Sequence, residues 1–228
     1  QSVVVVPPGM DFTELQRQAG EPLPEHIDDW LKKRAPAPVI VQVSMIRPEK
    51  GHDFMLEVFH NLKQKGERFY WLIVGGGCRE EEARLKAKID YLGMNDCVLM
   101  CGLLSPVAPV YRRASLMVMP SRNEAFGMAI VEATVCGVRV MASRVGGIPS
   151  VIHHGYNGIL LPPDDREAWE NALTSFLGAP EWAQPMVLRG QAEMDARYSI
   201  DSTVRALMTL GRRYRYIRWG DAPVDNFH

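Results

Sequence analysis

The 228-residue sequence lacks the features of several large protein classes. It has no apolar run near the roughly 20 residues that a membrane-spanning helix needs, and no secretory signal is recognisable. Its formal net charge of -1 gives no overall reason to expect nucleic acid as a partner. The four cysteines form no CxxC pair and have no histidine at ligand spacing. They are expected to be reduced thiols of the core in a cytoplasmic protein.

Two common phosphate-binding motifs are also missing. The glycine-rich segment VGGGCREEE fits neither the GxGxxG pattern of dinucleotide-binding enzymes nor the GxxxxGK(S/T) loop of P-loop ATPases. A nicotinamide enzyme and a P-loop ATPase are therefore not expected. The adjacent pair His153 and His154 is a poor metal-ligand set by itself, and we expect it at the surface.

Strand-like and helix-like segments alternate along most of the chain, and several strand-like runs are continuously apolar, as strands covered on both faces require. Strands are predicted at 2–6, 39–45, 69–75, 97–102, 116–120, 139–143 and 158–162. Helices are predicted at about 51–65, 80–92, 107–113, 127–136 and 148–153, and then at 164–178, 182–196 and 201–214. The alternation indicates a doubly wound parallel α/β sheet with a helical C-terminal tail. The proline-rich segment 19–38 is expected to be a surface excursion before the sheet.

Unusual residues collect where the predicted strands end, which is where an open parallel sheet binds its ligands. Arg47 and Lys50 follow the second predicted strand, and three glycines, Gly75 to Gly77, follow the third. The segments PSRNEAFGM and SRVGGIPS follow the fifth and the sixth. Basic side chains, glycine turns and helix N-termini on one edge suit a ligand that carries phosphates. Taken singly, each has a plainer explanation as a tight turn or a solvated charge.

The stretch NEAFGMAIVEATVCG predicts a helix over about 126–136 that is apolar on all sides and therefore buried. Glu132 lies in its middle, and a buried carboxylate needs a partner. That partner is either a vicinal diol such as a ribose, which can donate two hydrogen bonds, or a nearby arginine, Arg139 or Arg144. Glu124, just before the helix, lies either near the phosphates and their sugar or serves only as a helix-start charge.

The segment EAFGMAIVEATVCGVRVMAS resembles the signature of family 4 glycosyltransferases, which are retaining, nucleotide-sugar-dependent enzymes of the GT-B fold. The hallmark is a Glu, seven residues and a second Glu, with Phe-Gly after the first and Ala after the second. The segments VVVVPPGMD, RPEKGHDFMLEVFHNL and GGIPSVIHHGYNGILLPPDD agree with the family in order and spacing. The resemblance covers about residues 2–180.

This resemblance implies specific roles. Glu124 would contact the transferred sugar, Lys50 the diphosphate and Glu132 the nucleotide ribose, with Glu124 and Lys50 as the catalytic pair. The other donor-binding residues would be Arg47, Gly75, Gly77, Leu103, Phe126, Gly127 and Met128. Because the cleft has no Asp-rich metal ligands, these cations and the helix N-terminus would stabilise the departing diphosphate, and no cofactor or essential metal is expected.

The implied organisation is the donor-binding, C-terminal half of a GT-B enzyme. Residues 1–18 would form the interdomain crossing and first strand, 19–180 the Rossmann-like nucleotide-sugar domain, and 181–228 helices that complete it. An N-terminal acceptor domain would precede Gln1, and the fragment alone would bind donor but not transfer sugar. The acceptor would be a glycan, a lipid or a small molecule, as in bacterial polysaccharide, lipopolysaccharide or glycolipid synthesis.

Two positions depart from the family pattern. Members commonly have an Arg five positions before the loop lysine, where this chain has Met45, and Arg47 is a candidate replacement. The usual Gly-Gly-x-Pro-Glu ends here in Ser150. These departures keep open a non-catalytic nucleotide-sugar-binding module, and a nucleotide-sugar hydrolase or epimerase is a third class. The basic, aromatic tail 212–219 either packs onto the other half or makes a peripheral contact with the inner face of the membrane.

Overall fold

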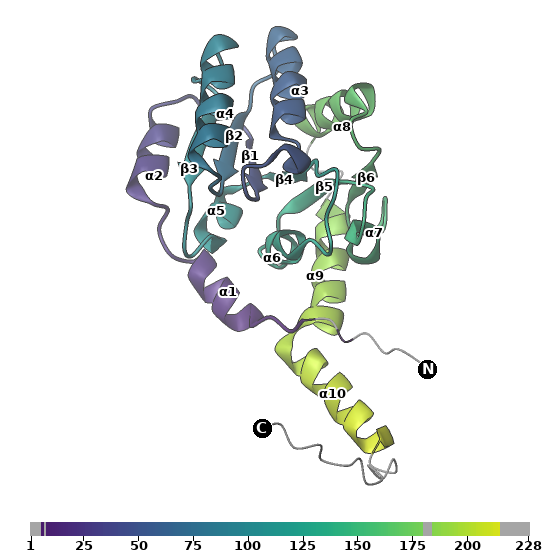
Figure 1. The fold of residues 1–228 in the computed structure, drawn as a ribbon. Coiled ribbons are helices and arrows are strands. Elements are labelled where there is room, and N and C mark those ends of the chain that lie inside the picture. The colour runs from purple at the N-terminus through teal and green to yellow at the C-terminus, as the bar shows by residue number, and fades with distance from the viewer. Residues whose placement is uncertain (1–5, 7, 180–183, 215–228) are drawn as a thin grey trace, which may run out of the picture.

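The computed structural model describes residues 6, 8–179 and 184–214, and its centre is one parallel sheet of six strands (Figure 1). The strands are β1 (Val39–Val43), β2 (Tyr70–Val74), β3 (Val98–Gly102), β4 (Leu116–Met119), β5 (Arg139–Ser143) and β6 (Ile159–Leu161). Each predicted strand from residue 39 onward is confirmed to within two residues at either end. The predicted strand at 2–6 lies almost wholly outside the described residues.

The strand order is β3-β2-β1-β4-β5-β6, the order of a Rossmann-like sheet. The chain builds outward from β1 to β3 and then returns, so that β4 pairs with β1 through Ile40 and Leu116 and through Val41 and Met117. The connections after β1 and β4 therefore run to opposite sides. This reversal is the topological switch point, beyond which such sheets bind ligands.

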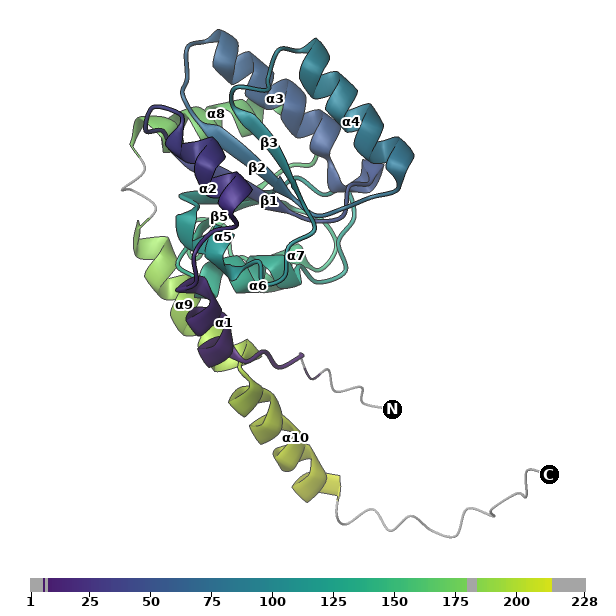
Figure 2. The same ribbon diagram turned by 90° about the vertical axis from the view of Figure 1, so that its left-hand side faces the viewer.

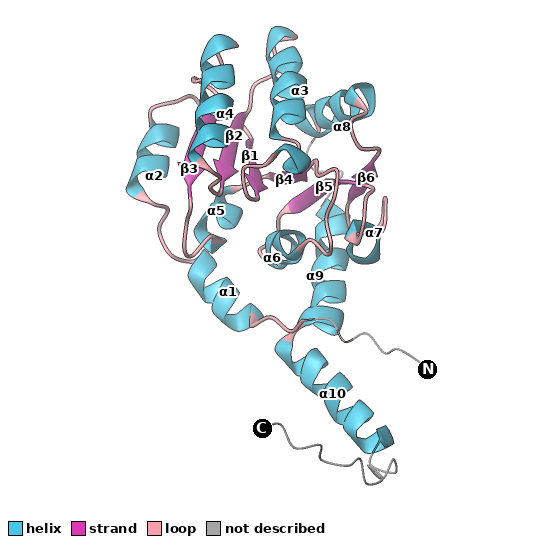
Figure 3. Ribbon diagram, in the orientation of Figure 1, coloured by secondary structure: helices cyan, strands magenta, loops and turns pink. Residues whose placement is uncertain are grey.

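Helices cover both faces of the sheet (Figures 2 and 3). They are α1 (Phe12–Ala19), α2 (Glu25–Lys32), the 3-10 turn η1 (Pro48–Lys50), α3 (His52–Gln64), α4 (Arg79–Tyr91), α5 (Ala108–Arg113), α6 (Met128–Val135), α7 (Ile148–Val151), α8 (Arg166–Gly178), α9 (Gln184–Tyr198) and α10 (Ile200–Tyr214). Residues of α3, α4 and α8 share one apolar core with one face of the sheet. Residues of α1, α2, α5, α6, α7 and α9 share a second core with the other face.

The strands are apolar on both sides because both sides are covered. Val39 and Val41 of β1 are fully buried in one core, and Ile40 between them is fully buried in the other. This arrangement explains the continuously apolar runs, since a strand with one wet face would alternate.

Two expectations about surface and core are wrong. The segment 19–38 is not a simple surface excursion, because it contains α2, whose Ile27 is fully buried and whose Leu31 is 7% exposed. The prolines flank this helix, and Pro24 stands directly before it, a position where proline is compatible with a helix start. Cys78 is not a core thiol, because it is exposed at the start of α4.

The start of the described chain is bonded to the junction between α9 and α10. The Met10 amide donates to the Tyr198 carbonyl at 2.9 Å, and the Ile200 amide donates to the Met10 carbonyl at 3.1 Å. From this point α10 extends away from the body of the domain (Figures 1 and 2). Within the described residues, no helix has the length and apolar character needed to cross a bilayer. Most of the tail 212–219 lies past residue 214 and is not described.

Candidate active site

A cavity of roughly 530 Å³ opens at the switch point, beyond the carboxyl ends of β1 and β4. Its lining comes from the end of β1 and the turn after it, from the end of β4 and its loop, and from the first residues of α6. The lining residues are Val43, Ser44, Met45, Arg47, Glu49, Lys50, Met119, Asn123, Glu124, Ala125, Gly127, Met128 and Ala129. Half of the predicted site residues therefore share one cavity.

Lys50 and Glu124 meet across this cavity. The Lys50 Nζ lies 2.7 Å from the Glu124 Oε2, and the two side chains are only 20% and 17% exposed. The two residues are 74 positions apart in sequence and come together because β4 pairs with β1. Because both side chains are largely shielded from water, loss of one partner leaves the other charge poorly compensated.

Glycines allow the backbones of this region to approach closely. Gly51, which follows Lys50, has φ +72°, and a Cβ there would lie 2.2 Å from the Pro120 carbonyl oxygen. A Cβ on Gly147 would lie 2.0 Å from the Ala125 carbonyl oxygen, and the Gly147 amide donates to the Glu124 carbonyl at 2.9 Å. The Gly-Gly pair after β5 thus fixes the loop that carries Glu124.

Helix α6 begins at the cavity. Gly127 precedes it with φ +92°, a conformation that favours glycine, and Met128 and Ala129 of its first turn line the cavity. The first amides of a helix have no carbonyl partner within the helix, so this end attracts an anion. The side chain of Phe126 points elsewhere, because its ring packs edge-to-face on Tyr198 of α9 at 5.3 Å.

Glu132, one turn further into α6, has a hydroxyl and not an arginine as its partner. The Tyr111 hydroxyl donates to the Glu132 Oε2 at 3.0 Å, and among the described residues no cation pairs with Glu132. Arg139, a candidate partner, instead donates to Gln184 at 2.8 Å. Burial raises the pKa of the Glu132 carboxyl, and the hydrogen bond from Tyr111 offsets part of that rise. The carboxylate therefore keeps unused acceptor capacity in a partly dry site.

Comparison with protein families identifies the family of this chain. Residues 25–192 match the family model described as glycosyl transferases group 1, which is more than half of the chain and includes all the cavity-lining residues. The chain belongs to this family.

Curated relatives of this glycosyltransferase domain are named D-inositol 3-phosphate glycosyltransferases. The protein from Segniliparus rotundus is 31% identical over 212 residues, covering 91% of this chain and 46% of the relative. The protein from Mycolicibacterium paratuberculosis is 36% identical over 184 residues, covering 77% of this chain and 40% of the relative. The domain thus spans about half the length of the curated relatives that it matches.

Solved structures share the fold of the glycosyltransferase domain. HepE from Anabaena, in complex with UDP and glucose, superposes with a TM-score of 0.74 at 21% identity, covering 89% of this chain and 55% of that one. A glycosyltransferase from Rickettsia africae superposes with a TM-score of 0.80 at 22% identity, covering 94% of this chain and 58% of that one. The C-terminal domain of a group 1 family glycosyl transferase from Francisella tularensis gives 0.66 at 20% identity, covering 84% of this chain and all of that domain.

The other predicted residues of the glycosyltransferase domain lie outside the cavity lining. Gly75 and Gly77 have a packing reason to be glycine, since a Cβ would lie 2.0 Å from the Ser44 carbonyl oxygen at the first and 2.5 Å from the Ile46 carbonyl oxygen at the second. Leu103, after β3, is 82% exposed.

Arg47 does line the cavity, but its side chain is 55% exposed and its Nη1 lies 3.9 Å from the Glu49 carboxylate. It is thus less confined than Lys50. The histidine at position 153, expected at the surface, has a half-exposed side chain whose Nδ1 lies 3.4 Å from Glu193.

Three residues that sequence reasoning missed support this site. Tyr111 holds Glu132, and the buried Gln42 donates through Nε2 to the Lys50 carbonyl at 2.9 Å. Arg122 holds the turn before Lys50, as shown below. Arg122 lies in the segment PSRNEAFGM and Gln42 in the predicted strand 39–45, but neither residue type signalled a contact with the Lys50 turn. Tyr111 reaches Glu132 only because α5 packs beside α6. The described part of the chain has no group of three or more His, Cys, Asp or Glu side chains placed to hold a metal ion.

Proposed function

We propose that this domain binds a nucleoside diphosphate sugar and is the donor-binding, C-terminal half of a retaining hexosyltransferase. The single observation that carries this proposal is the Lys50–Glu124 pair at the switch point, beside the N-terminus of α6, in a chain of the group 1 family. A cation and a helix N-terminus suit a diphosphate, and a carboxylate beside them suits sugar hydroxyls.

In this proposal each end of the donor meets a matching group. The diphosphate lies between Lys50 and the first amides of α6, and the transferred sugar donates hydroxyl hydrogens to Glu124. The ribose diol donates to Glu132, whose carboxylate is hydrogen-bonded to the Tyr111 hydroxyl among the described residues. The base lies toward Leu103 and the glycine turn after β2. UDP in the Anabaena neighbour makes uridine nucleotides the first ones to test.

The Lys50–Glu124 pair changes partners in the proposed reaction. In the free domain the two charges neutralise each other at 2.7 Å. A bound donor brings two anionic phosphates to Lys50 and several hydroxyls to Glu124, so that both groups stay satisfied. When the anomeric C–O bond breaks, negative charge grows on the diphosphate and positive charge on the sugar ring. Lys50 and the α6 amides stabilise the first, and preorganised charges of this kind supply a large share of catalysis.

We further propose that transfer needs the part of the relatives that this chain does not span. The chain covers 46% of the Segniliparus relative, and all the residues that line its cavity lie within 43–129. Transfer requires an acceptor within about 3 to 3.5 Å of the anomeric carbon and the exclusion of water. The acceptor, a glycan, a lipid or a small molecule, would bind to that other part. No metal is needed in this scheme, and we propose that the protein acts in the cytoplasm or at the inner face of a membrane.

A specific observation favours a second candidate, a non-catalytic nucleotide-sugar-binding module. Met45 lines the cavity and is 49% exposed, at a position where the family pattern has an arginine. If Arg47 does not replace that arginine, the leaving diphosphate would have one cation fewer than a transferase needs. A nucleotide-sugar epimerase or hydrolase is a weaker candidate, since the paired glutamates are not typical of it.

Calorimetry of the 228-residue chain against UDP-, GDP- and ADP-sugars tests donor binding. The proposal expects one nucleotide class to bind clearly better than the others, and no binding by any would refute it. A sugar-release and transfer assay with the preferred donor then separates the candidates. Transfer by the full-length protein but not by this chain supports the half-enzyme, and donor binding without transfer by either supports the non-catalytic module. Robust transfer by this chain alone would refute the placement of the acceptor site.

A further inference from the structure

The turn that presents Lys50 is held from outside at three successive carbonyls. The Pro48 carbonyl accepts a hydrogen bond from the Arg122 Nη1 at 2.7 Å, and the Glu49 carbonyl accepts one from the Arg122 backbone amide at 2.7 Å. The Lys50 carbonyl accepts one from Gln42 at 2.9 Å. Two of these three contacts come from one residue, Arg122, which lies in the β4–α6 loop two positions before Glu124.

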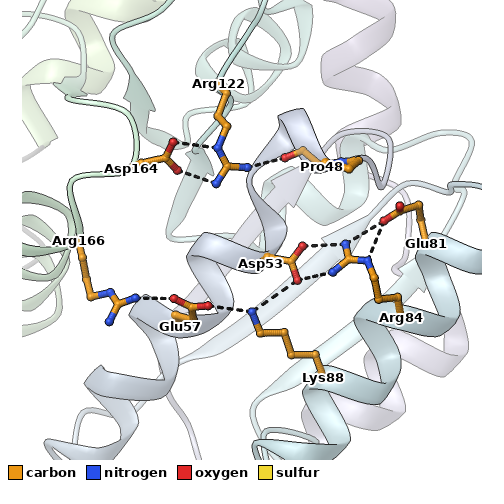
Figure 4. Close-up of polar contacts among 9 residues, drawn as sticks. All are labelled: Pro48, Asp53, Glu57, Glu81, Arg84, Lys88, Arg122, Asp164 and Arg166. Carbon is orange, nitrogen blue, oxygen red and sulfur yellow. Dashed lines mark hydrogen bonds and ion pairs between the residues drawn. The ribbon is translucent and has the colours of Figure 1, made fainter.

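Asp164 fixes the guanidinium that makes the first contact. Its two carboxylate oxygens lie 2.8 Å from the Arg122 Nε and 2.7 Å from the Arg122 Nη2, a bidentate pair that leaves Nη1 directed at the Pro48 carbonyl (Figure 4). Asp164 is also the one described non-glycine residue with positive φ, at +56°. Asp and Asn tolerate this conformation better than other side chains, and such positions often mark constrained sites.

A neighbouring ion pair shows what is special about this arrangement. Arg166 and Glu57 form a similarly exposed pair, with side chains 51% and 42% exposed against 43% and 46% for Arg122 and Asp164. Glu57 of α3 also accepts a hydrogen bond from Lys88 of α4, so that Glu57 links α3 to both α8 and α4 (Figure 4). Within the described residues this pair has no hydrogen bond to the backbone of the Lys50 turn, whereas Arg122 has one to the Pro48 carbonyl.

We infer that Arg122 and Asp164 are positioning residues that hold the Pro48–Lys50 turn at the distance where Lys50 meets Glu124 and the donor diphosphate. We call this pair, with its contact to the Pro48 carbonyl, the Arg122 brace. It joins the β6–α8 loop to the β4–α6 loop and both to the turn after β1, so it spans the switch point. Arg122 acts through the turn and not by touching the donor. The inference rests on the proposed function, since it gives the held lysine a diphosphate to bind.

The variant Asp164→Asn separates positioning from simple attraction. Asn also tolerates positive φ, so the backbone keeps its conformation while the bidentate pair is lost. If Arg122 only attracted phosphate by its charge, releasing it from Asp164 would leave UDP binding unchanged or tighter. If Arg122 positions the turn, Asp164→Asn and Arg122→Lys should each weaken UDP binding about three- to ten-fold, the range for one or two lost hydrogen bonds. Neither variant should change uridine binding.

The matched control is Glu57→Gln, which breaks the neighbouring pair of similar exposure. UDP affinity of this control should equal that of the wild type. Equal weakening in the control, or weakening of UDP and uridine alike in the Asp164 variant, would overturn the inference, since either would show a general loss of structure. Unchanged or tighter UDP binding in Asp164→Asn would also overturn it.

Amide hydrogen exchange without ligand gives an independent test. The Lys50 amide donates to the Arg47 carbonyl at 3.0 Å and the Gly51 amide to the Pro48 carbonyl at 3.2 Å. Both amides should exchange faster in Asp164→Asn and Arg122→Lys than in Glu57→Gln, and unchanged exchange would overturn the brace. If the wild type binds no nucleotide of the UDP, GDP or ADP series, the proposed function fails, while this exchange measurement still decides whether the brace holds the turn.

Discussion

The substitution Glu132→Gln tests the most specific contact in the proposed site. In the free domain the carboxylate is partly buried, its pKa is raised by desolvation, and it accepts from the Tyr111 hydroxyl at 3.0 Å. Gln has nearly the same shape and can still accept from Tyr111, but it carries no charge. The change therefore removes a charged acceptor from the site without opening a cavity.

The stability of the fold should not fall. A carboxyl group whose pKa is raised in the folded state contributes stability below its unfolded pKa, near 4.5, and that contribution is lost as the pH rises through the folded value. At pH 7 the ionised, desolvated Glu132 therefore destabilises the wild-type fold. Glu132→Gln lacks this cost and should be at least as stable in urea. Donor binding should weaken by about 1.5 to 3 kcal/mol, or roughly 10- to 150-fold, because hydrogen bonds to a charged group are lost.

Calorimetry with UDP-glucose, whose diphosphate charge does not change there, measures the effect over a pH series that starts at the ordinary carboxyl pKa of 4.5 and rises from it. Wild-type affinity should fall as the pH drops through the raised pKa of Glu132, because the protonated form accepts fewer hydrogen bonds, and Glu132→Gln should lack this dependence. Tyr111→Phe removes the hydrogen bond that lowers the pKa of Glu132. The pH at which this variant loses half of its UDP-glucose affinity should therefore be higher than in the wild type. Normal binding by Glu132→Gln, or its failure to fold, would refute the ribose contact and make Glu132 a structural residue.

Five other substitutions test the site and its surroundings. Lys50→Ala should weaken UDP binding by about 1.5 to 3 kcal/mol and uridine binding little, and Arg47→Ala should do the same if Arg47 replaces the missing family arginine; unchanged UDP affinity would make Arg47 a surface charge. Gly147→Ala should lower the free energy of unfolding in urea by about 1 to 3 kcal/mol, because its Cβ would overlap a backbone oxygen, whereas Gly178→Ala, with open space around it, should not destabilise the fold. Burial lowers the pKa of His52 from 6.5 to about 4, so its stabilising contribution, present above pH 6.5, should be lost as the pH falls toward 4. The full loss is about 3 kcal/mol, and a urea series at several pH values should show a shallower decline for His52→Asn.

The sequence could predict the strands and the edge of the sheet where the site lies, because both depend on local patterns. Continuously apolar runs identify strands that are covered on both faces, and their carboxyl ends lie on one edge of a parallel sheet. The placement of Lys50, Glu124 and α6 around one cavity agrees with this reasoning. The sequence could not show that Lys50 and Glu124 touch, since their contact requires β4 to pair with β1, and the strand order is not written in any single segment.

The sequence could not predict side-chain partners that come from other segments of the chain either. Tyr111 is 21 residues from Glu132 and reaches it only because α5 packs beside α6, while the protein partners considered from the sequence were two arginines closer along the chain. In the same way α2 escaped notice because the prolines around it suggest a loop, although Ile27 is packed in the core. Tertiary contacts, and not local preference, decide both cases.

If the proposed function holds, the ion pair between Lys50 and Glu124 should also disfavour inorganic phosphate and free sugars as ligands. Inorganic phosphate could bind Lys50 only by leaving the mostly covered Glu124 carboxylate without a counter-charge, and a free sugar could bind Glu124 only by leaving Lys50 in the same condition. Glu124 therefore competes with phosphate for Lys50, and Lys50 competes with a free sugar for Glu124. A molecule that carries phosphates and hydroxyls at the right separation replaces both interactions at once, so the abundant phosphate and free sugars of a cell should leave the cavity open to the intact donor.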